Sequence, residues 1–372
     1  MNPRHHNDCL NWIRILGSDI FQLKSVKVVL KVMLCIYSIL SVLQIYFFAS
    51  SPSMAKVFSC GAAFFQICYI AFVTSILLLK DHMVDDVVAV IDWWPLDSVG
   101  HETKNKFTKL SKWINRFAVL NISILLVFAT TIFFSSDEDN GLAFVRHILD
   151  QIFSHWSKFF FVFFKITVFL PSFMMSAHIY QLFYSAQHII FQMKLLKMFI
   201  RRMASTSSST EEDLMYDDSY QEEINAKLKI IIDRHCNFIR WQQMTLMTMS
   251  NLIIPYLTSA ILVALSIAFR FLQDVLWWPN YVIAVTLLAN IYSIIAAGQT
   301  LEDESEKIFV ELTTLQWYNW NLKNKKIFLT ILTATTRPIN IKFSEKFVVN
   351  NRMLLFIYQT LYSVLSMFLS MK

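Results

Sequence analysis

The sequence predicts an all-α membrane protein with seven transmembrane helices, and three observations carry this prediction. Of the 372 residues, 55% are hydrophobic and only 16% are charged, whereas soluble domains average about 25% charged residues. The chain has only 5 glycines and 7 prolines, which argues against a loop-rich or all-β protein. Seven apolar runs are also long enough to cross a bilayer core of about 30 Å as helices of roughly 20 residues.

Each apolar run is expected to be a helix, because a segment in lipid must satisfy its backbone hydrogen bonds internally. The third run is the weakest span, since it is the shortest and contains Asn121 and Ser123. The seven predicted spans are Val28–Ser50, Val57–Leu79, Phe117–Phe134, Phe159–Tyr184, Met247–Phe269, Leu276–Gly298 and Phe347–Met371.

The distribution of lysine and arginine predicts the orientation of these spans. The N-terminal segment and every second loop hold 25 of these residues, whereas the segments on the other side hold 5. We therefore expect a cytoplasmic N-terminus and an extracellular C-terminus, the opposite of a G-protein-coupled receptor. None of the 5 cysteines falls in a predicted outside loop, which excludes a disulfide there. The segment before the first span lacks the pattern of a cleavable signal peptide.

The predicted cytoplasmic segments are patterned rather than simple loops. Apolar residues at helical spacing predict that spans four, five and six extend beyond the membrane and pack there, although a helix lying on the headgroups is the alternative. Residues 11–23 form a short amphipathic stretch, which predicts an interfacial helix. Residues 201–223 are rich in Ser and Thr and then acidic, which predicts a disordered loop. The apolar face before span five comprises Ile224, Leu228, Ile231, Ile232, His235, Phe238 and Ile239.

Motifs of enzymes and cofactor sites are missing from the sequence: it has no phosphate-binding glycine loop, no paired metal ligands and no nucleophile elbow. We therefore expect neither an enzyme nor a bound cofactor or metal. Lys165 is the one charge deep in an apolar span. It is expected to extend toward the membrane surface, with a place in a binding cavity as the alternative.

Short motifs in the last seventy-odd residues resemble the C-terminal signature of insect odorant receptors, and the seven-span layout resembles that family over the whole chain. A basic-His pair, Arg234-His235, precedes span five as it does in the family. The motifs, in order, are Gly298-Gln299-x-Leu301, Glu304-Ser305, Trp317-Tyr318, Thr336-Arg337-Pro338, Phe343, Phe347 and Thr360-x-Tyr362-Ser363.

The resemblance implies an odour-tuning subunit of a ligand-gated, non-selective cation channel, assembled with olfactory co-receptor subunits into a heterotetramer in the plasma membrane of a sensory dendrite. It divides the chain into an N-terminal segment (1–27), spans one to six with an odorant pocket (28–298), a cytoplasmic anchor (299–346) and a pore-lining last helix (347–372). The anchor residues that it implies are His235, Gln299, Glu304, Trp317 and Tyr318.

The same resemblance places the odorant in the outer halves of spans two, three, four and six. Such a pocket is expected to bind a volatile by shape and a few polar contacts. For each candidate residue, ordinary core or lipid-facing packing is the alternative. The candidate ligand-binding residues are Phe65, Tyr69, Phe72, Phe128, Phe164, Val168 and Tyr281.

The last span presents two faces that could border a pore. Gln359, Ser363, Ser366 and Ser370 form a polar stripe, which can either join helices or line a water path. By counting back from the C-terminus, the resemblance implies that Met367 and Met371 form the hydrophobic gate on a face about 100° away. A gustatory-type receptor channel of the same superfamily and a seven-helix transporter are the alternative functions.

Overall fold

The computed structural model describes residues 8–50, 54–79, 83–89, 94, 101–134, 143–205, 215–272, 279–343 and 347–370. Within these residues the regular structure is helical, apart from an isolated antiparallel bridge between Lys342 and Val348. The elements are α1 (Asn11–Arg14), the π-helical turn η2 (Ile15–Asp19), α2 (Ile20–Gln22), α3 (Lys24–Ser50), α4 (Met54–Leu79), α5 (Met83–Ala89), α6 (His101–Phe134), α7 (Ala143–Ile152), α8 (Ser157–Thr167), α9 (Phe169–Ser205), α10 (Asp218–Leu272), α11 (Pro279–Thr313), the 3₁₀ turn η4 (Trp317–Asn319), α12 (Leu322–Thr335) and α13 (Asn351–Ser370).

The predicted all-helical fold class is confirmed. Apart from Val168 and residues 347–350, every described residue of the seven predicted spans is helical. Four helical stretches in the described residues are long and apolar enough to cross a membrane, and Phe64–Leu79 and Ile254–Ala268 are shorter apolar helices. The side of the membrane on which each terminus lies stays a prediction.

Span four differs from its prediction because it is two helices rather than one. Helix α8 ends at Thr167 and α9 begins at Phe169, with the backbone N–H of Val168 bonded to the carbonyl of Lys165 at 3.2 Å. Pro171 explains the break, since proline has no N–H to donate to the carbonyl of Thr167 four residues earlier.

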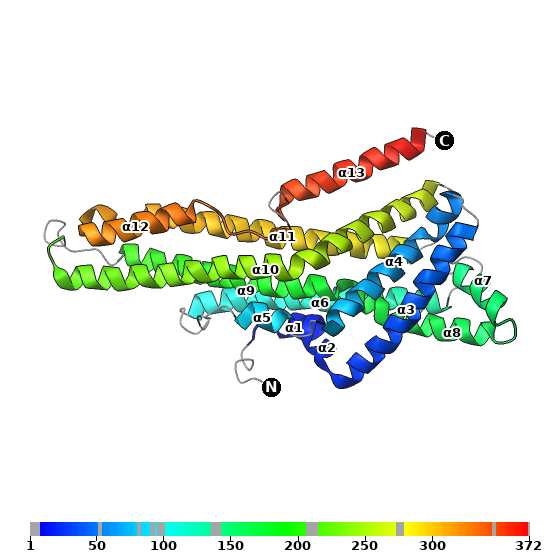
Figure 1. Ribbon diagram of the computed structural model, residues 1–372. Helices are drawn as coiled ribbons and strands as arrows, with labels where there is room; N and C mark the ends of the chain where they lie inside the picture. The colour runs from blue at the N-terminus through cyan, green and yellow to red at the C-terminus, as the bar shows by residue number, and fades with distance from the viewer. Residues whose placement is uncertain are drawn as a thin grey trace.

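Helices α9, α10 and α11 continue far beyond the length of a membrane span, as the sequence predicts. Helix α10 alone has 55 residues, about 80 Å at 1.5 Å per residue. Figure 1 shows α10, α11 and α12 running side by side at the end of the molecule opposite α7. This end is called the anchor end below, and the end that carries Ser50, Phe134 and Leu272 is called the outer end.

The apolar face predicted on the anchor part of α10 is confirmed. Its residues are buried or half-buried, with Leu228, Ile231 and Phe238 fully inside. The predicted disordered loop at the neighbouring connection needs correction at both ends, because residues 201–205 end α9 and residues 218–223 begin α10. Residues 206–214 of the predicted disordered segment lie outside the described residues.

Helix α13 contacts α10 and α11, and beyond its start it diverges from the bundle (Figure 1). The chain approaches α13 through a tight passage against α11 at Gly298. A Cβ built on Gly298 would collide with the carbonyl oxygen of Val349 and would lie 3.0 Å from the carbonyl carbon. Glycine is therefore required where α11 meets the segment that leads into the last helix.

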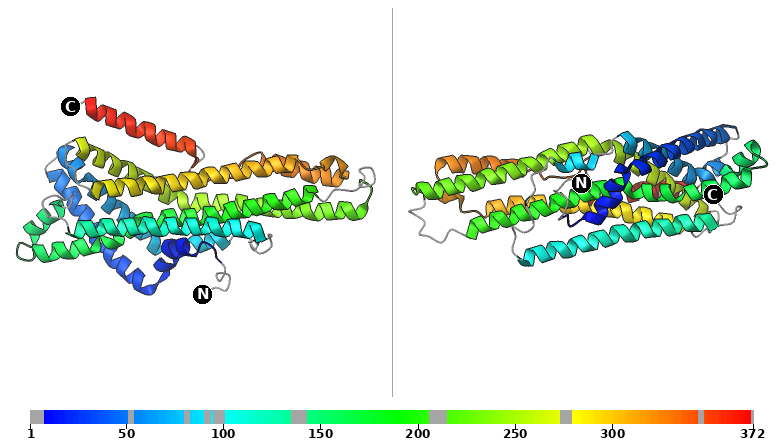
Figure 2. Two further views of the ribbon diagram at one scale, coloured as in Figure 1. Left: turned by 180° about the vertical axis from the view of Figure 1, so that it is seen from behind. Right: turned by 90° about the horizontal axis from the view of Figure 1, so that it is seen from below.

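The N-terminal segment is folded against the bundle rather than extended from it. Leu10, Ile13 and Phe21 are buried, whereas Trp12 is exposed. Gly17 lets this segment approach α9 closely, since a Cβ there would lie 3.1 Å from the Cβ of Tyr180. The residues of the predicted interfacial helix thus pack against α6 and α9 (Figure 2), and their place at a membrane surface stays a prediction.

Candidate functional site

An apolar cluster at the outer end, called the outer cluster, collects side chains from almost every span. Helices α3, α4, α6, α7, α8, α10 and α11 all contribute to it. Its buried members are Tyr37, Leu40, Ile67, Phe128, Ile132, Val145, Ile148, Phe161, Phe164, Val263, Ile267 and Ile283.

Four of the seven candidate ligand residues come together in the outer cluster. Phe128 and Phe164 are buried members, and Phe65 and Val168 are half-buried and pack against it. Phe164 also faces Tyr37 with the ring centroids 6.2 Å apart. These residues belong to α4, α6, α8 and the break before α9, so the sequence brings three separate spans to one aromatic region.

The other three candidates lie elsewhere. Tyr69 is buried in the larger core, with its ring 5.6 Å from that of Tyr256. Phe72 is 38% exposed and Tyr281 is 47% exposed, so both side chains lie on the surface of the bundle. Their direction around the helix axis depends on which neighbours pack against α4 and α11, and the residue types alone do not disclose it.

Lys165 lies inside the outer end of the bundle. Its side chain is 6% exposed, and its ammonium lies 4.9 Å from the ring centroid of Phe161. The expected extension toward the membrane surface is therefore wrong. The negative face of the aromatic ring attracts the cation and offsets part of the cost of burying it. The alternative placement, within the region that gathers the ligand candidates, agrees with this geometry.

About two helical turns from the outer cluster along α6 and α11 lies a polar cluster that the sequence did not predict. Asn121 Nδ2 donates to Tyr180 Oη at 2.9 Å and to Asn290 Oδ1 at 2.5 Å, and Asn290 Nδ2 donates to Ser176 Oγ at 2.9 Å. All four side chains are buried. The only signal in the sequence was a polar amide within an apolar span. This cluster joins α6, α9 and α11.

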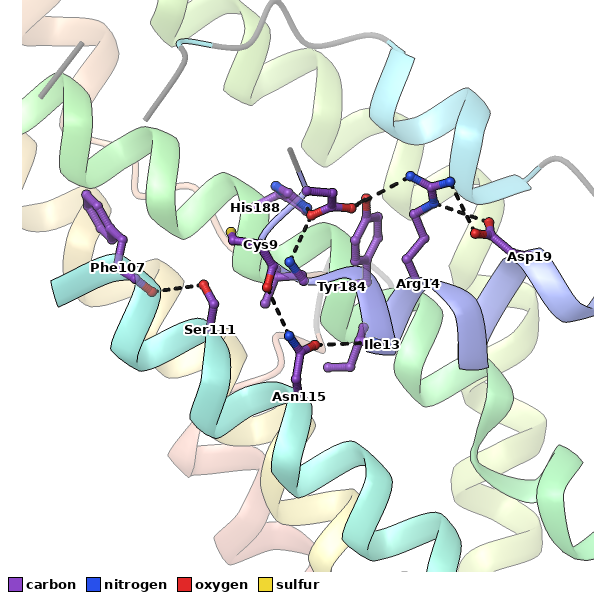
Figure 3. A network of polar contacts seen from close by, with 11 residues as sticks. Cys9, Ile13, Arg14, Asp19, Phe107, Ser111, Asn115, Tyr184 and His188 are labelled. Atoms are coloured by element: carbon purple, nitrogen blue, oxygen red, sulfur yellow. Dashed lines mark hydrogen bonds and ion pairs between the residues drawn. The ribbon is translucent and has the colours of Figure 1, made fainter. Parts of the chain in front are cut away.

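A second polar network fixes the N-terminal segment (Figure 3). Asp8 accepts a hydrogen bond from Tyr184 Oη at 2.6 Å, and its carboxylate lies 3.3 Å from His188 Nε2. Burial opposes ionisation of Asp8, but the hydrogen bonds and charge of its neighbours outweigh it and lower its pKa from 3.8 to about 2. Arg14 pairs with Asp19 at 3.1 Å, so the carboxylates and cations of this segment are compensated locally.

The same segment is also bonded to α6. Asn115 Nδ2 donates to the carbonyl of Cys9 at 2.9 Å, and Asn115 Oδ1 accepts from the backbone of Ile13 at 3.4 Å. Gln181 of α9 donates to the carbonyl of Gly17 at 2.8 Å. These are contacts between residues far apart in the sequence, which is why periodicity within residues 11–23 gave no sign of them.

Among the candidate anchor residues, Gln299 and Glu304 form bonds within the chain. Glu304 is buried and accepts from Lys197 Nζ at 2.7 Å and from Lys307 Nζ at 3.0 Å. Burial opposes its ionisation, but the two lysines outweigh this effect and lower its pKa below the usual value. Gln299 Oε1 accepts from the backbone of Asn351 at 3.2 Å, which ties α11 to the first residue of α13.

The aromatic candidates of the anchor are partly exposed. Trp317 is 40% exposed and Tyr318 is 50% exposed, and Trp317 stacks on Phe328 with the ring centroids 6.3 Å apart. Trp320, which was not a candidate, is instead buried against the edge of Phe328. Trp317 and Tyr318 thus present large apolar surface that this chain does not bury.

His235 and its neighbour Arg234 hold other parts of the anchor together. Burial lowers the pKa of His235, and the backbone carbonyl of Ala334 in α12 offsets part of this effect. The Arg234 guanidinium lies 4.4 Å from the ring centroid of Trp94. The side chain of Gln192, on α9, accepts a hydrogen bond from the backbone N–H of Trp94 at 3.1 Å and donates one to its carbonyl at 3.2 Å.

The candidate pore residues lie on a helix that has few partners within the chain. Gln359, Ser363, Met367 and Ser370 are exposed and Ser366 is half-buried. Leu355, Phe356, Tyr358 and Tyr362 are exposed apolar or aromatic neighbours on the same helix. Met371 lies outside the described residues. Both predicted faces are therefore accessible for contacts beyond this chain.

Comparisons with known proteins place the fold. The sequence matches no model of a protein family, and no curated protein sequence matches it. Two solved structures of the insect olfactory receptor OR5 from Machilis hrabei are similar over 98% of this chain and 97% of that one, at 12% sequence identity. The TM-score is 0.73 for the complex with eugenol and 0.72 for the other structure. The chain therefore has the fold of an insect olfactory receptor.

Proposed function

We propose that this chain is the odorant-binding subunit of a heteromeric, ligand-gated, non-selective cation channel. The observation that carries the proposal is the match of nearly the whole chain to the OR5 receptor of Machilis hrabei at a TM-score of 0.73. A likeness over 98% of the chain includes the membrane helices, the anchor end and the last helix together. The C-terminal motifs that resemble the insect odorant receptor family lie in the same segments.

The ligand is a small volatile molecule bound at the outer cluster. The eugenol complex of the similar receptor supports a compact aromatic ligand as a probe. Phe65, Phe128, Phe164 and Val168 gather at this cluster, and an aromatic lining of this kind favours recognition by shape. Lys165 adds a cation over the ring of Phe161. Tyr69 lies in the larger core, and Phe72 and Tyr281 lie on the bundle surface, so these three candidates are outside the proposed binding region.

The channel opens through coupling between the ligand-binding region and the last helix. Asn290 connects α11 to α6 and α9 near the ligand-binding region, and Gly298 and Gln299 connect the same α11 to the start of α13. A shift of α11 on ligand binding is thereby passed to α13 as a rigid element. In the assembly, the exposed side of α13 lines a central pore.

The partners are olfactory co-receptor subunits in a heterotetramer, with membrane lipid around it and cations passing through it. The exposed Trp317 and Tyr318 and the unpaired flank of α13 support an assembly of several chains, since large exposed apolar groups mark contact surfaces. The site of action is the plasma membrane of a sensory dendrite. A gustatory-type receptor channel of the same superfamily is the second candidate, because the same fold and exposed last helix serve it equally; a seven-helix transporter is the third.

Whole-cell currents test this proposal. Three sets of cells are prepared: one expresses this chain alone, one expresses it with an olfactory co-receptor, and one expresses the co-receptor alone. Each set is exposed to a panel of volatiles that includes eugenol. We expect cation currents that require both chains and whose odorant profile differs from that of the co-receptor alone. Tastant-evoked currents without the co-receptor would favour the gustatory alternative, and substrate uptake without channel currents would favour the transporter.

A further inference from the structure

Helix α6 carries a group of exposed basic residues. Lys109, Lys112 and Arg116 are exposed, and within the described part of the chain no carboxylate forms an ion pair with any of them. Lys106, by contrast, pairs with Glu102 at 2.7 Å. Three uncompensated positive charges therefore lie within two turns of one helix, on a face that faces away from the core residues Phe107 and Ile114.

An exposed tryptophan lies in the middle of these charges. Trp113 is 69% exposed, and the Arg116 guanidinium lies 5.9 Å from its ring centroid. Stacking on the indole orients the planar guanidinium and leaves its N–H groups available to an anion. The four residues Lys109, Lys112, Trp113 and Arg116 are called the basic stripe below.

The basic stripe continues directly into apolar surface toward the outer end. Leu120, Val127 and Phe134 follow Trp113 at intervals of seven residues, so they lie on nearly the same face of α6. All three are exposed, and Figure 2 shows α6 along one edge of the bundle. Since α6 is long and apolar enough to cross a membrane, this face changes from lipid-facing to basic between Leu120 and Arg116.

The change from apolar to basic residues defines the height of the membrane surface on α6. Tryptophan favours this level because its ring is apolar and its N–H is polar, and Lys and Arg extend their charged ends toward the headgroups. A second exposed tryptophan, Trp12, lies on the N-terminal segment, which Asn115 fixes to the same part of α6. Trp113, three cations and the N-terminal segment that carries Trp12 thus lie along the same part of α6.

We propose that the basic stripe is a docking surface for anionic phospholipid headgroups in the leaflet on the side of the anchor end. The phosphate and carboxylate of phosphatidylserine complement the guanidinium and the two ammonium groups. The acyl chains lie along Leu120, Val127 and Phe134. A lipid fits this face better than a second protein chain does, because the charges carry a single sign and continue the exposed apolar face of a helix that is long and apolar enough to cross a membrane.

Lipid retention tests the proposal with the full-length protein. The protein is reconstituted in nanodiscs of phosphatidylcholine and phosphatidylserine in equal amounts, transferred to detergent, and analysed by native mass spectrometry for the lipids that stay bound. We expect wild type to retain phosphatidylserine over phosphatidylcholine, and added salt to weaken this preference through screening. The variant with Lys109→Ala, Lys112→Ala and Arg116→Ala is expected to lower the preference about tenfold or more.

A matched variant removes the same charge elsewhere. Lys323→Ala, Lys326→Ala and Arg337→Ala change three exposed basic residues in and just after α12, and this variant is expected to retain phosphatidylserine as wild type does. Equal retention by the α6 variant and wild type would overturn the proposal, as would an equal loss in the α12 variant. Unchanged lipid retention with impaired subunit assembly in the α6 variant would assign the stripe to a protein contact instead.

Discussion

Asn121 of α6 and Asn290 of α11 share a side-chain hydrogen bond of 2.5 Å in the buried centre of the helix bundle. Ser176 and Tyr180, both on α9, complete the cluster. Amide groups can form several hydrogen bonds each, so this cluster specifies how three helices meet. In a membrane protein such bonds average about 0.6 kcal/mol, but leaving a buried amide without a partner costs more.

Replacing Asn290 tests this cluster. Asn290→Ala removes one hydrogen-bond partner from the buried Asn121 amide, which keeps Tyr180, and one from the buried Ser176 hydroxyl, so we expect a loss of about 1–3 kcal/mol in unfolding free energy. The double variant with Asn121→Ala should lose less than the sum of the two single changes. Thermal unfolding of the purified protein measures both effects. Ser123→Ala, on an exposed site of α6, is the control, and an equal loss there would contradict the role of the cluster.

The passage at Gly298 predicts a sharp difference between two glycines. Gly298→Ala places a Cβ against the backbone carbonyl of Val349, which has no freedom to rotate away, so α13 must shift relative to α11. We expect loss of stable folding or of ligand-evoked current. Gly61→Ala meets the hydroxyl of Ser266 at 3.0 Å, which a side-chain rotation relieves. Surface expression and current together check this pair, and equal tolerance of both changes would refute the close approach at Gly298.

Local patterns in the sequence predicted the helices because length and hydropathy are properties of a single segment. The extension of α9, α10 and α11 was predictable for the same reason, since Leu228, Ile231 and Phe238 repeat at helical spacing. Pro171 is a local signal for the break at Val168. The prediction of span four rested on the length of its apolar run and therefore missed the break. The resemblance to the odorant receptor family placed Phe128 and Phe164 in one pocket. The exposure of Phe72 depends instead on which helices cover α4.

Contacts between distant segments were not predictable from spacing. The hydrogen bonds of Asp8 with Tyr184 and of Asn115 with Cys9 join residues that are 176 and 106 positions apart. Neither pair carries a motif, and the amphipathic pattern of residues 11–23 suits a membrane surface and a protein groove equally. Only the packed arrangement of α6 and α9 decides between them.

The buried His235 predicts an acid sensitivity of the anchor. Its pKa is lowered below 6.5 by burial, so below pH 6.5 the unfolded chain binds a proton that the folded chain resists. The free energy of unfolding should therefore fall as pH falls below 6.5 and be fully retained above it. His235→Asn should flatten this dependence. Thermal unfolding across the pH range checks it, with His155→Asn as the exposed control; an unchanged slope in the His235 variant would contradict the assignment.

The gate prediction concerns the two faces of α13. A hydrophobic constriction closes a pore by excluding water, so Met367→Ser should raise basal current or change ion selectivity. The size of this effect should fall with the number of subunits that lack the substitution. Ser366→Leu should have less effect on basal current. Recordings without ligand check both variants. If Ser366→Leu alters permeation and Met367→Ser does not, the serine stripe lines the pore and Met367 is not the gate.

The central claim, that a volatile binds at the outer cluster and opens the channel, is tested most directly by concentration–response curves for several odorants. Phe128→Leu and Phe164→Leu change ring shape within the cluster while keeping it apolar, so we expect each to shift the sensitivity to some odorants and not others. Phe72→Leu, on the exposed surface of α4, should leave the ranking as in wild type. A uniform change across all odorants in the two cluster variants, or a reordered ranking in Phe72→Leu alone, would contradict the account.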